Sequence, residues 1–177
     1  EKIDGTNSLA EIVEHDPTDD EAYRDVIAYN EGMTLRMYAG SRTRYITPGK
    51  TTDNFGFAAW VQEHADQLWA LGPGKHYGEW YGQGIQRGYG LNEKRFALFN
   101  VARWNTLERP ECCDLVPVLA TGLFTTELVR QALALLESGS YVAPAFMNPE
   151  GIVIYHTASK QLYKVTLDGD GVPKSRR

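Results

Sequence analysis

The sequence has little cysteine and no long apolar run. Its 177 residues include two cysteines, adjacent at Cys112 and Cys113. Adjacent cysteines rarely bridge, and two thiols without a second pair make a poor zinc site, so we expect reduced thiols and an intracellular protein. No apolar run approaches the roughly 18 residues of a membrane-spanning helix, so we expect no membrane span. The length, with 42% apolar residues, suits one domain with its own core.

A uniform excess of basic charge is also lacking. The net charge is −5, which by itself argues against a nucleic-acid partner. Of the 23 acidic and 18 basic residues, however, eight acids and one base lie between residues 11 and 31. The remainder therefore holds 15 acids and 17 bases. We interpret the acidic segment as a solvated loop and helix face, which leaves room for a basic surface elsewhere.

Helical spacing of apolar residues occurs in two long segments. In residues 52–71 the spacing runs through Phe57, Val61, Ala65 and Leu68, and Asp53 or Asn54 can cap the start. Residues 125–139 predict a second helix with one apolar side, formed by Leu128, Ala132, Leu133 and Leu136, and Gly139 follows its end. Residues 15–27 predict a loop and a short helix capped by Asp16, Thr18 or Asp19.

Strand patterns are more numerous than helical ones. They cover residues 34–46, where Gly40 and Ser41 bend or end the first half, and also 76–85, 95–104, 113–122 and 150–167, the last as two strands joined by a polar turn. Strands dominate and their order is irregular, which is typical of an α+β fold with antiparallel sheets rather than a βαβ repeat. No repeat or linker divides the chain, so residues 1–177 are expected to form a single domain.

One short motif near the start carries candidate chemistry. Lys2 is followed two residues later by Asp4 and Gly5. A lysine amine is a nucleophile only when neutral, and burial, neighbouring cations or a metal lower its pKa enough. The glycine allows the chain to turn tightly beside the amine.

Further motifs follow in a fixed order: GSRTR at 40–44, GEWYG at 78–82, FALFNV at 96–101, EGIVI at 150–154 and LYKVTL at 162–167. With EKIDGTN at 1–7, this order resembles the covalent nucleotidyltransferases, the ATP-dependent polynucleotide ligases and mRNA capping enzymes. The Thr-Asn pair after the glycine resembles the RNA ligases of the bacteriophage RNA ligase 2 type. GEWYGQGIQRGYG is similar to a stretch in RNA ligases of actinobacterial phages.

The resemblance implies a reaction and its central residues. Lys2 would attack the α-phosphorus of ATP and form a lysyl–AMP intermediate. AMP would then pass to an RNA 5′-phosphate, which is sealed to a 3′-hydroxyl. Glu150 matches the carboxylate near the metal, Mg²⁺ or Mn²⁺, and near the reacting lysine. The implied partner is RNA with 3′-hydroxyl and 5′-phosphate ends, and we expect a monomer in the cytoplasm, that of the host cell if a phage encodes the protein.

Contacts to the nucleoside are implied at four positions. Glu1 would lie against the adenine edge, and Ile3 is included among the nucleotide-binding residues. Glu79 matches the carboxylate that holds the ribose hydroxyls. Phe99 matches the aromatic side chain that stacks on adenine. From the residues alone Phe99 could equally be core, since Ala97, Phe99 and Val101 alternate on one face of a strand.

Contacts to phosphate and RNA are implied at three more positions. Arg42 matches the arginine that contacts the nucleotide and later the RNA end, although a solvated strand edge is the alternative. Lys164 matches a lysine on the α-phosphate, and its apolar strand favours a partnered charge. Asn7 matches the asparagine required for sealing. The family usually has a second lysine where this chain has Thr166, which can donate a hydrogen bond to phosphate but cannot neutralise it.

Three functional interpretations stay open at this stage. The first is the ATP-dependent RNA ligase. The second is a DNA ligase or a GTP-dependent capping-type enzyme. The third is a non-catalytic nucleotide- or RNA-binding domain of the same fold, which Thr166 favours. We also expect the natural chain to extend upstream of Glu1 and to add a strand there, because Lys2 would otherwise lie where chain ends fray and Ile3 would lack cover. No accessory domain is visible after the last motif.

Overall fold

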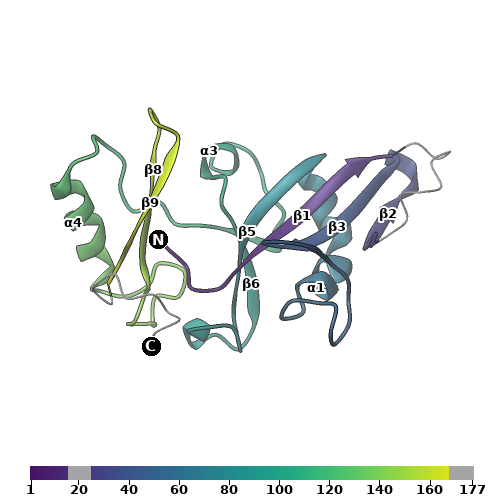
Figure 1. Cartoon of the computed structure of the whole chain (residues 1–177), viewed down its shortest axis with the longest axis horizontal. Helices are drawn as coiled ribbons and strands as arrows, with labels where there is room; N and C mark the ends of the chain where they lie inside the picture. The colour runs from purple at the N-terminus through teal and green to yellow at the C-terminus, as the bar shows by residue number, and fades with distance from the viewer. Residues whose placement is uncertain (16–24, 168–177) are drawn as a thin grey trace. The chain divides into compact units, whose positions relative to one another are not determined.

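The computed structural model describes residues 1–15 and 25–167, which form two compact units (Figure 1). Residues Gly5–Leu115 form what we call the sheet unit. Glu1–Asp4 and the chain from Val116 onward form what we call the hairpin unit. The caps expected at Asp16, Thr18 or Asp19, and most of the short helix that they would begin, lie outside the described residues. The expectation of a single nucleotidyltransferase domain stays a prediction.

Within the described residues of the sheet unit, seven strands form one sheet. Its strands are β1 (Thr6–Glu14), β2 (Ala28–Asn30), β3 (Leu35–Ser41), β4 (Tyr45–Ile46), β5 (Gly74–Gly82), β6 (Lys94–Leu98) and β7 (Cys113–Leu115). The order is β2-β3-β1-β5-β6-β7, and β4 pairs with β3. All neighbours are antiparallel except β6 and β7, which are parallel. The mixed architecture with mostly antiparallel pairing agrees with the α+β prediction.

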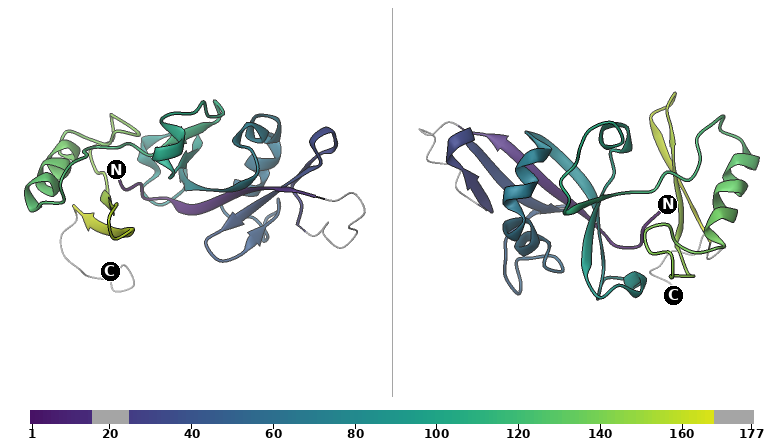
Figure 2. Two further views of the ribbon diagram at one scale, coloured as in Figure 1. Left: turned by 90° about the horizontal axis from the view of Figure 1, so that it is seen from above. Right: turned by 180° about the vertical axis from the view of Figure 1, so that it is seen from behind.

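One face of this sheet is covered by the helices α1 (Phe57–Glu63) and α2 (Ala65–Leu68), as the views in Figure 2 show for α1. The four apolar residues whose spacing predicted this helical segment are all buried in the core, so the prediction is confirmed. Asp53 also acts as expected, because its carboxylate accepts hydrogen bonds from the backbone N–H groups of Ala58 at 2.8 Å and Ala59 at 3.0 Å. A 3₁₀ turn, Trp69–Leu71, completes the segment.

The strand predicted over residues 95–104 is wrong in its second half. Strand β6 ends at Leu98, and the short helix α3 (Val101–Trp104) begins three residues later. The Asn100 side chain accepts a hydrogen bond from the backbone N–H of Arg103 at 3.1 Å, which caps this helix. Alternating apolar residues suggested a strand, but the local cap decided the backbone conformation.

Two further 3₁₀ turns span Glu31–Met33 and Gly88–Gly90.

The hairpin unit packs one helix on two strands. Helix α4 (Thr126–Leu136) begins after Thr125, whose hydroxyl accepts the backbone N–H of Leu128 at 3.2 Å. Strands β8 (Gly151–His156) and β9 (Gln161–Thr166) form an antiparallel hairpin. Ala132, Leu136 and Ile152 form the buried cluster between helix and hairpin. The helix and both strands were predicted from the sequence, and these predictions are confirmed.

The two cysteines remain free thiols, as expected. Their sulfur atoms lie 4.0 Å apart, and Cys113 is buried in the core of the sheet unit. The hydrogen bond between the thiols lowers the pKa of Cys112 and raises that of Cys113, where burial adds to the rise. Across residues 1–15 and 25–167, no helix combines the length and the apolar character that crossing a bilayer requires.

Candidate active site

Lys2 is attached to the hairpin unit as a partner of strand β8. Its backbone N–H donates to the carbonyl of Gly151 at 2.8 Å, and the two residues form an antiparallel bridge. The Lys2 ammonium forms an ion pair with Glu150, the residue before β8. The two side chains are 20% and 4% exposed. A motif at the start of the chain and one near its end therefore meet at a largely buried charge pair.

Gly151 makes this arrangement possible through its backbone. Its φ is +147°, and a Cβ atom at this position would lie 2.1 Å from the carbonyl oxygen of Val165 and 2.8 Å from the Cα of Thr166. Strand β9 therefore approaches β8 more closely here than any side chain allows. The glycine of the EGIVI motif is required by packing, and it fixes the position of Glu150 beside it.

We expect Gly151→Ala to destabilise the hairpin unit. The substitution adds both strain at positive φ, roughly 1–3 kcal/mol, and a clash with the β9 backbone. Gly74→Ala is the matched control, because Gly74 also has positive φ, +131°, but a Cβ there meets no atom within 4 Å. Denaturant unfolding should show a larger loss for Gly151→Ala than for Gly74→Ala. Equal losses would mean that β9 moves away at little cost.

Glu1 is held by a turn that follows helix α4. Its Oε1 atom accepts a hydrogen bond from the Ser140 hydroxyl at 2.6 Å. Its Oε2 atom accepts the backbone N–H groups of Tyr141 at 2.7 Å and Val142 at 3.3 Å. Ser140 is itself only 2% exposed. The carboxylate next to the candidate nucleophile is thus anchored by three donors from one turn.

This anchor predicts a specific effect for Ser140→Ala. The variant removes the only side-chain donor among these three hydrogen bonds, so Glu1 and the adjoining Lys2 should be held less firmly. We expect about 1–3 kcal/mol of lost stability, measured by denaturant unfolding. Ser138→Ala, an exposed serine bonded to Leu135 at the end of α4, is the control. Unchanged stability in Ser140→Ala would show that the two backbone donors suffice.

Ile3 is buried at 4% exposure, and Asp4 at 8%. The Ile3 side chain is therefore already covered, so the lack of cover at Ile3 is not a reason to expect an upstream strand.

Lys164 lies on β9 opposite Val153 and is exposed. Thr166 lies opposite Gly151 on the same face of the hairpin as Lys164, because successive residues alternate between faces. Lys2, paired with Gly151, is bridged to this same end of the hairpin.

In the sheet unit, Asn7 and Glu79 are direct partners across β1 and β5. The Glu79 carboxylate accepts the backbone N–H of Gly5 at 3.1 Å. A Cβ at Gly5 would lie 2.3 Å from the carbonyl oxygen of Trp80, so this glycine too is required by a close backbone approach. Two of the predicted site residues and the glycine of the lysine motif therefore meet at one end of β1.

Phe99 follows the end of β6, and its backbone N–H donates to the carbonyl of Tyr77 at 2.9 Å. The side chain is 38% exposed, whereas Phe96, Ala97 and Leu98 are buried. The alternative that Phe99 belongs to the core is therefore wrong. Arg42 lies in the turn between β3 and β4 and is exposed.

A family model for RNA ligase matches residues 1–166. The chain belongs to the RNA ligase family. The match spans both units and every motif described above, from Lys2 to Lys164. The sequence has no significant match among curated proteins or solved structures.

Membership of the RNA ligase family raises the question of a metal. In the part of the chain that the structure describes, no three histidine, cysteine or acidic side chains gather as a metal site. Glu150 is a buried carboxylate beside Lys2. Mg²⁺ keeps several waters and takes few protein ligands, so one carboxylate is chemically sufficient for this ion.

The sequence did not reveal the residues that hold Glu1. Ser140 lies 139 positions away along the chain, in a segment that carries none of the quoted motifs. Gly139, with φ of +118°, and the bond from the Ser140 backbone N–H to the Phe146 carbonyl at 2.9 Å shape its turn. The GS dipeptide after a helix indicates a turn, but nothing in it indicates which carboxylate the turn binds.

Proposed function

We propose that this member of the RNA ligase family is an ATP-dependent ligase that works through a lysyl–AMP intermediate. The Lys2 nitrogen attacks the α-phosphorus of ATP, a nitrogen–phosphorus bond forms, and pyrophosphate leaves. An oxygen of an RNA 5′-phosphate then attacks the same phosphorus and releases Lys2. In the last step a 3′-hydroxyl attacks the activated 5′-phosphate, the phosphodiester forms, and AMP leaves.

The observation that carries the proposal is the buried pair of Lys2 and Glu150. An ammonium group cannot attack phosphorus, so its proton has to move to Glu150 or to solvent before the bond forms. A carboxylate that ligates Mg²⁺ is a poor proton acceptor, so the proton passes to solvent, and the contact with Glu150 fixes the position of the amine. Glu150 is also the residue that we propose for Mg²⁺, which when bound supplies positive charge that offsets the phosphates.

Further roles within the hairpin unit follow from position. Glu1 and Ile3 are buried on either side of Lys2, and we propose them as residues that shape the nucleotide site. Lys164 is the cation that we propose for the α-phosphate. Thr166, on the same face of the hairpin, offers a hydroxyl where the family usually has a lysine, so Lys164 carries more of the charge neutralisation here.

In the sheet unit we propose that Glu79 accepts hydrogen bonds from the ribose hydroxyls. It already accepts the Gly5 N–H, and a carboxylate has further lone pairs available. Asn7, its direct partner, is proposed for the sealing steps, and Arg42 for the nucleotide and the RNA end. Phe99 is proposed to stack on adenine, which its exposure allows.

Phe99→Ala should weaken ATP binding by about 1–3 kcal/mol, the scale of an aromatic–base stack. Phe99→Leu should lose part of this affinity while keeping the volume of the side chain. Calorimetric titration with ATP measures both, with thermal unfolding beside it. Equal ATP affinity in all three proteins would remove Phe99 from the nucleotide site.

The proposed function is tested by incubating the protein with α-labelled ATP and Mg²⁺, followed by denaturing electrophoresis. We expect label on the protein with ATP and none with GTP. Label from GTP alone would indicate a capping-type transferase instead. No label from either nucleotide would favour a binding domain without catalysis.

Joining of RNA is the second half of the test. The labelled protein, given RNA with a 5′-phosphate and a 3′-hydroxyl, should lose its label and yield a joined strand. A matched DNA substrate separates an RNA ligase from a DNA ligase. Joining of the DNA in preference to the RNA would overturn the proposed substrate.

A further inference from the structure

The sheet of the sheet unit has a second face, which carries side chains that the proposed chemistry does not use. Residues paired across neighbouring strands project to the same side. Glu11 pairs with Tyr38 on β3 and with Lys75 on β5. Ala10 and Ile12, which alternate with Glu11 along β1, are buried, and Ile12 belongs to the core under the helices. Glu11 and its partners Tyr38 and Lys75 therefore lie on the face of the sheet opposite the helices.

Three tyrosines gather on this face. Leu9 lies two residues before Glu11 on β1 and so faces the same side of the sheet. Its cross-strand partners are Tyr77 on β5 and Gly40 on β3, and Gly40 pairs in turn with Tyr45 on β4. Tyr45 and Tyr77 are each 46% exposed, and Tyr38 on β3 is half-buried. We call Tyr38, Tyr45 and Tyr77 the tyrosine face. Exposed aromatic side chains on an open sheet are the surface on which single-stranded RNA modules stack bases.

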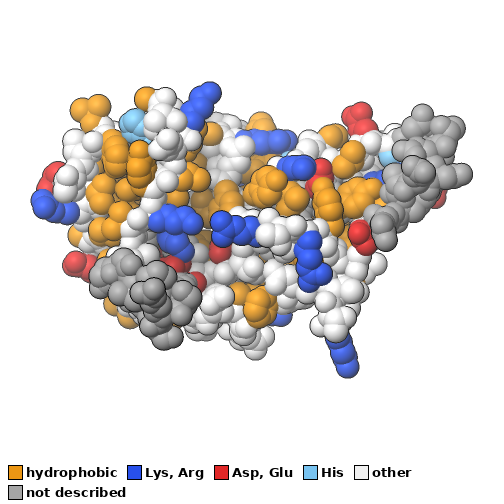
Figure 3. Space-filling view, in the orientation of Figure 1, with side chains coloured by type: hydrophobic (Ala, Val, Ile, Leu, Met, Phe, Trp, Pro, Cys, Tyr) orange, Lys and Arg blue, Asp and Glu red, His pale blue; other side chains and the backbone are white. Residues whose placement is uncertain are grey.

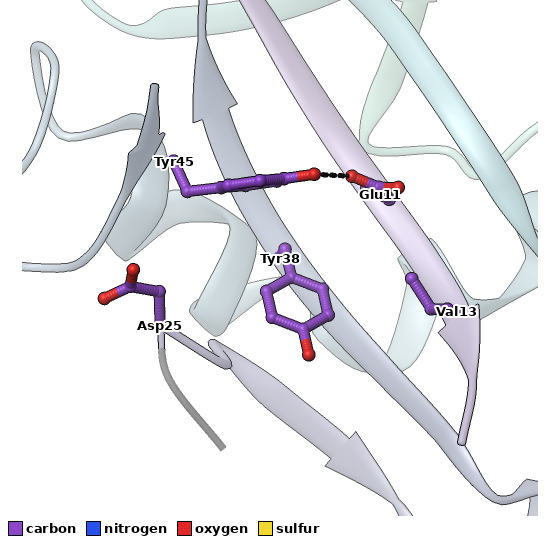
Figure 4. A pocket seen from close by; sticks show the side chains of 5 residues that line it. All are labelled: Glu11, Val13, Asp25, Tyr38 and Tyr45. Carbon is purple, nitrogen blue, oxygen red and sulfur yellow. Dashed lines mark hydrogen bonds between the residues drawn. The ribbon is translucent and has the colours of Figure 1, made fainter. Parts of the chain in front are cut away.

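A depression of about 380 Å³ opens on this face (Figure 4). It is lined by Glu11, Val13, Asp25, Tyr38 and Tyr45. The rings of Tyr38 and Tyr45 have centroids 5.7 Å apart and planes inclined by 56°. A flat base can therefore stack on one ring while its edge contacts the other, but the two rings cannot sandwich it.

We propose that the tyrosine face binds an unpaired stretch of the RNA substrate, with one base in this depression. The proposal deepens the proposed function, since it assigns part of the RNA path of the same enzyme. It commits to RNA rather than to a protein partner because of the charges around the face and its continuity with the candidate site.

The charges suit a strand whose phosphates lie outside the depression and whose base lies within it. The Nζ atom of Lys75 lies 3.7 Å from Oε1 of Glu11, and the Tyr45 hydroxyl donates a hydrogen bond to Oε2 of the same carboxylate. The ammonium and the hydroxyl together offset the negative charge of Glu11. The hydrogen bond to Glu11 raises the pKa of Tyr45 to about 12. Carboxylate oxygens such as those of Glu11 and Asp25 accept hydrogen bonds from the amino groups of bases.

Basic side chains for the phosphates are close in the fold. Arg42 and Arg44 are exposed in the turn that leads into Tyr45. Figure 3 shows Lys and Arg side chains (blue) next to hydrophobic side chains (orange, which includes tyrosine) over the central strands of the sheet. Phosphate contacts supply most of the affinity for a nucleic-acid strand, and stacking on aromatic rings adds to it.

Continuity with the candidate site comes from strand β1. Asn7 and Glu11 lie on the same face of this strand, four residues apart, which is about 13 Å along a strand. A strand of RNA whose end lies at Asn7 reaches Tyr45 within a few nucleotides. The tyrosine face therefore extends a row of residues that already contains two predicted site residues.

The test measures binding of an unphosphorylated oligoadenylate by fluorescence anisotropy, with polyphosphate as an anionic probe that has no bases. Tyr45→Ala and Tyr38→Ala should each weaken RNA binding about 5- to 150-fold and leave polyphosphate binding unchanged. Tyr45→Phe keeps the ring and should bind RNA within about twofold of wild type. Tyr163→Ala, which removes a tyrosine of 40% exposure that packs on Phe124, is the matched control and should bind normally.

RNA binding that is unchanged in both alanine variants overturns the proposal. A parallel loss for polyphosphate also overturns it, because the face would then act through charge alone. Transfer of AMP to Lys2 needs no RNA, so the tyrosine variants should label like wild type. A wild-type protein that binds RNA through these tyrosines but never takes up AMP would refute the proposed ligase activity and leave the RNA surface standing.

Discussion

Lys2→Ala is expected to abolish covalent transfer of AMP to the protein. The amine of Lys2 is the proposed nucleophile, and an alanine has no group that attacks phosphorus. The loss should therefore be complete rather than partial when the protein is incubated with α-labelled ATP and Mg²⁺. Label retained by the variant would assign the nucleophile to another residue.

Stability needs a separate control for this variant. Lys2→Ala leaves the buried carboxylate of Glu150 without its cation, and breaking a buried ion pair in this way costs roughly 3–5 kcal/mol. Lys2→Arg keeps a cation for Glu150 but offers no neutral amine at ordinary pH. We expect this variant to remain folded by circular dichroism and to take up no AMP. Normal labelling of Lys2→Arg would contradict the assignment.

Glu150→Gln is expected to have the second largest effect. It preserves the shape of the side chain and removes its charge, so both the partner of Lys2 and the proposed ligand for Mg²⁺ are lost. The rate of AMP transfer should fall on the order of 100-fold, and the Mg²⁺ concentration at half-maximal rate should rise. Glu137→Gln, an exposed acid at the end of α4, is the control in the same unit.

The folded state of Glu150→Gln should suffer less than its activity. Glutamine can still accept a hydrogen bond from the Lys2 ammonium, so this variant should lose less stability than Lys2→Ala and stay folded at the temperature of the assay. An unchanged transfer rate together with an unchanged Mg²⁺ dependence would remove Glu150 from the mechanism and leave it a structural partner of Lys2.

Much of the fold could be predicted because its elements carry strong local patterns. The buried residues Phe57, Val61, Ala65 and Leu68 recur at helical spacing, and the apolar side of α4 does the same. The prediction over residues 95–104 was wrong after Leu98 because the alternation of apolar residues continues to Val101, whereas the side chain of Asn100 caps a helix there. A cap depends on one side chain and is easily outweighed by a longer pattern.

The candidate site could be predicted only in its residue types. The order of motifs suggested that Lys2 and Glu150 act together, and the structure brings them into contact. The exposure of Phe99 removed the core alternative, and its stacking on adenine stays a prediction. The anchoring of Glu1 by Ser140 was not predictable, because a hydrogen bond between residues 139 positions apart leaves no local pattern.

The requirement for glycine at positions 5 and 151 also comes from contacts between different strands. Each glycine is fixed by a backbone carbonyl of another strand, that of Trp80 on β5 for Gly5 and that of Val165 on the hairpin partner β9 for Gly151. The lysine motif suggested a tight turn at Gly5. The structure shows close approaches between strands instead, and these depend on the tertiary fold.

The most direct test of the central claim is to locate the covalent adduct. The protein is incubated with ATP and Mg²⁺, digested under conditions that preserve a phosphoramide bond, and analysed by tandem mass spectrometry. We predict one AMP per chain, attached to the side chain of Lys2 and released when RNA with a 5′-phosphate is added. An adduct on any other residue, or RNA joining with ATP in the absence of any adduct, would contradict the account.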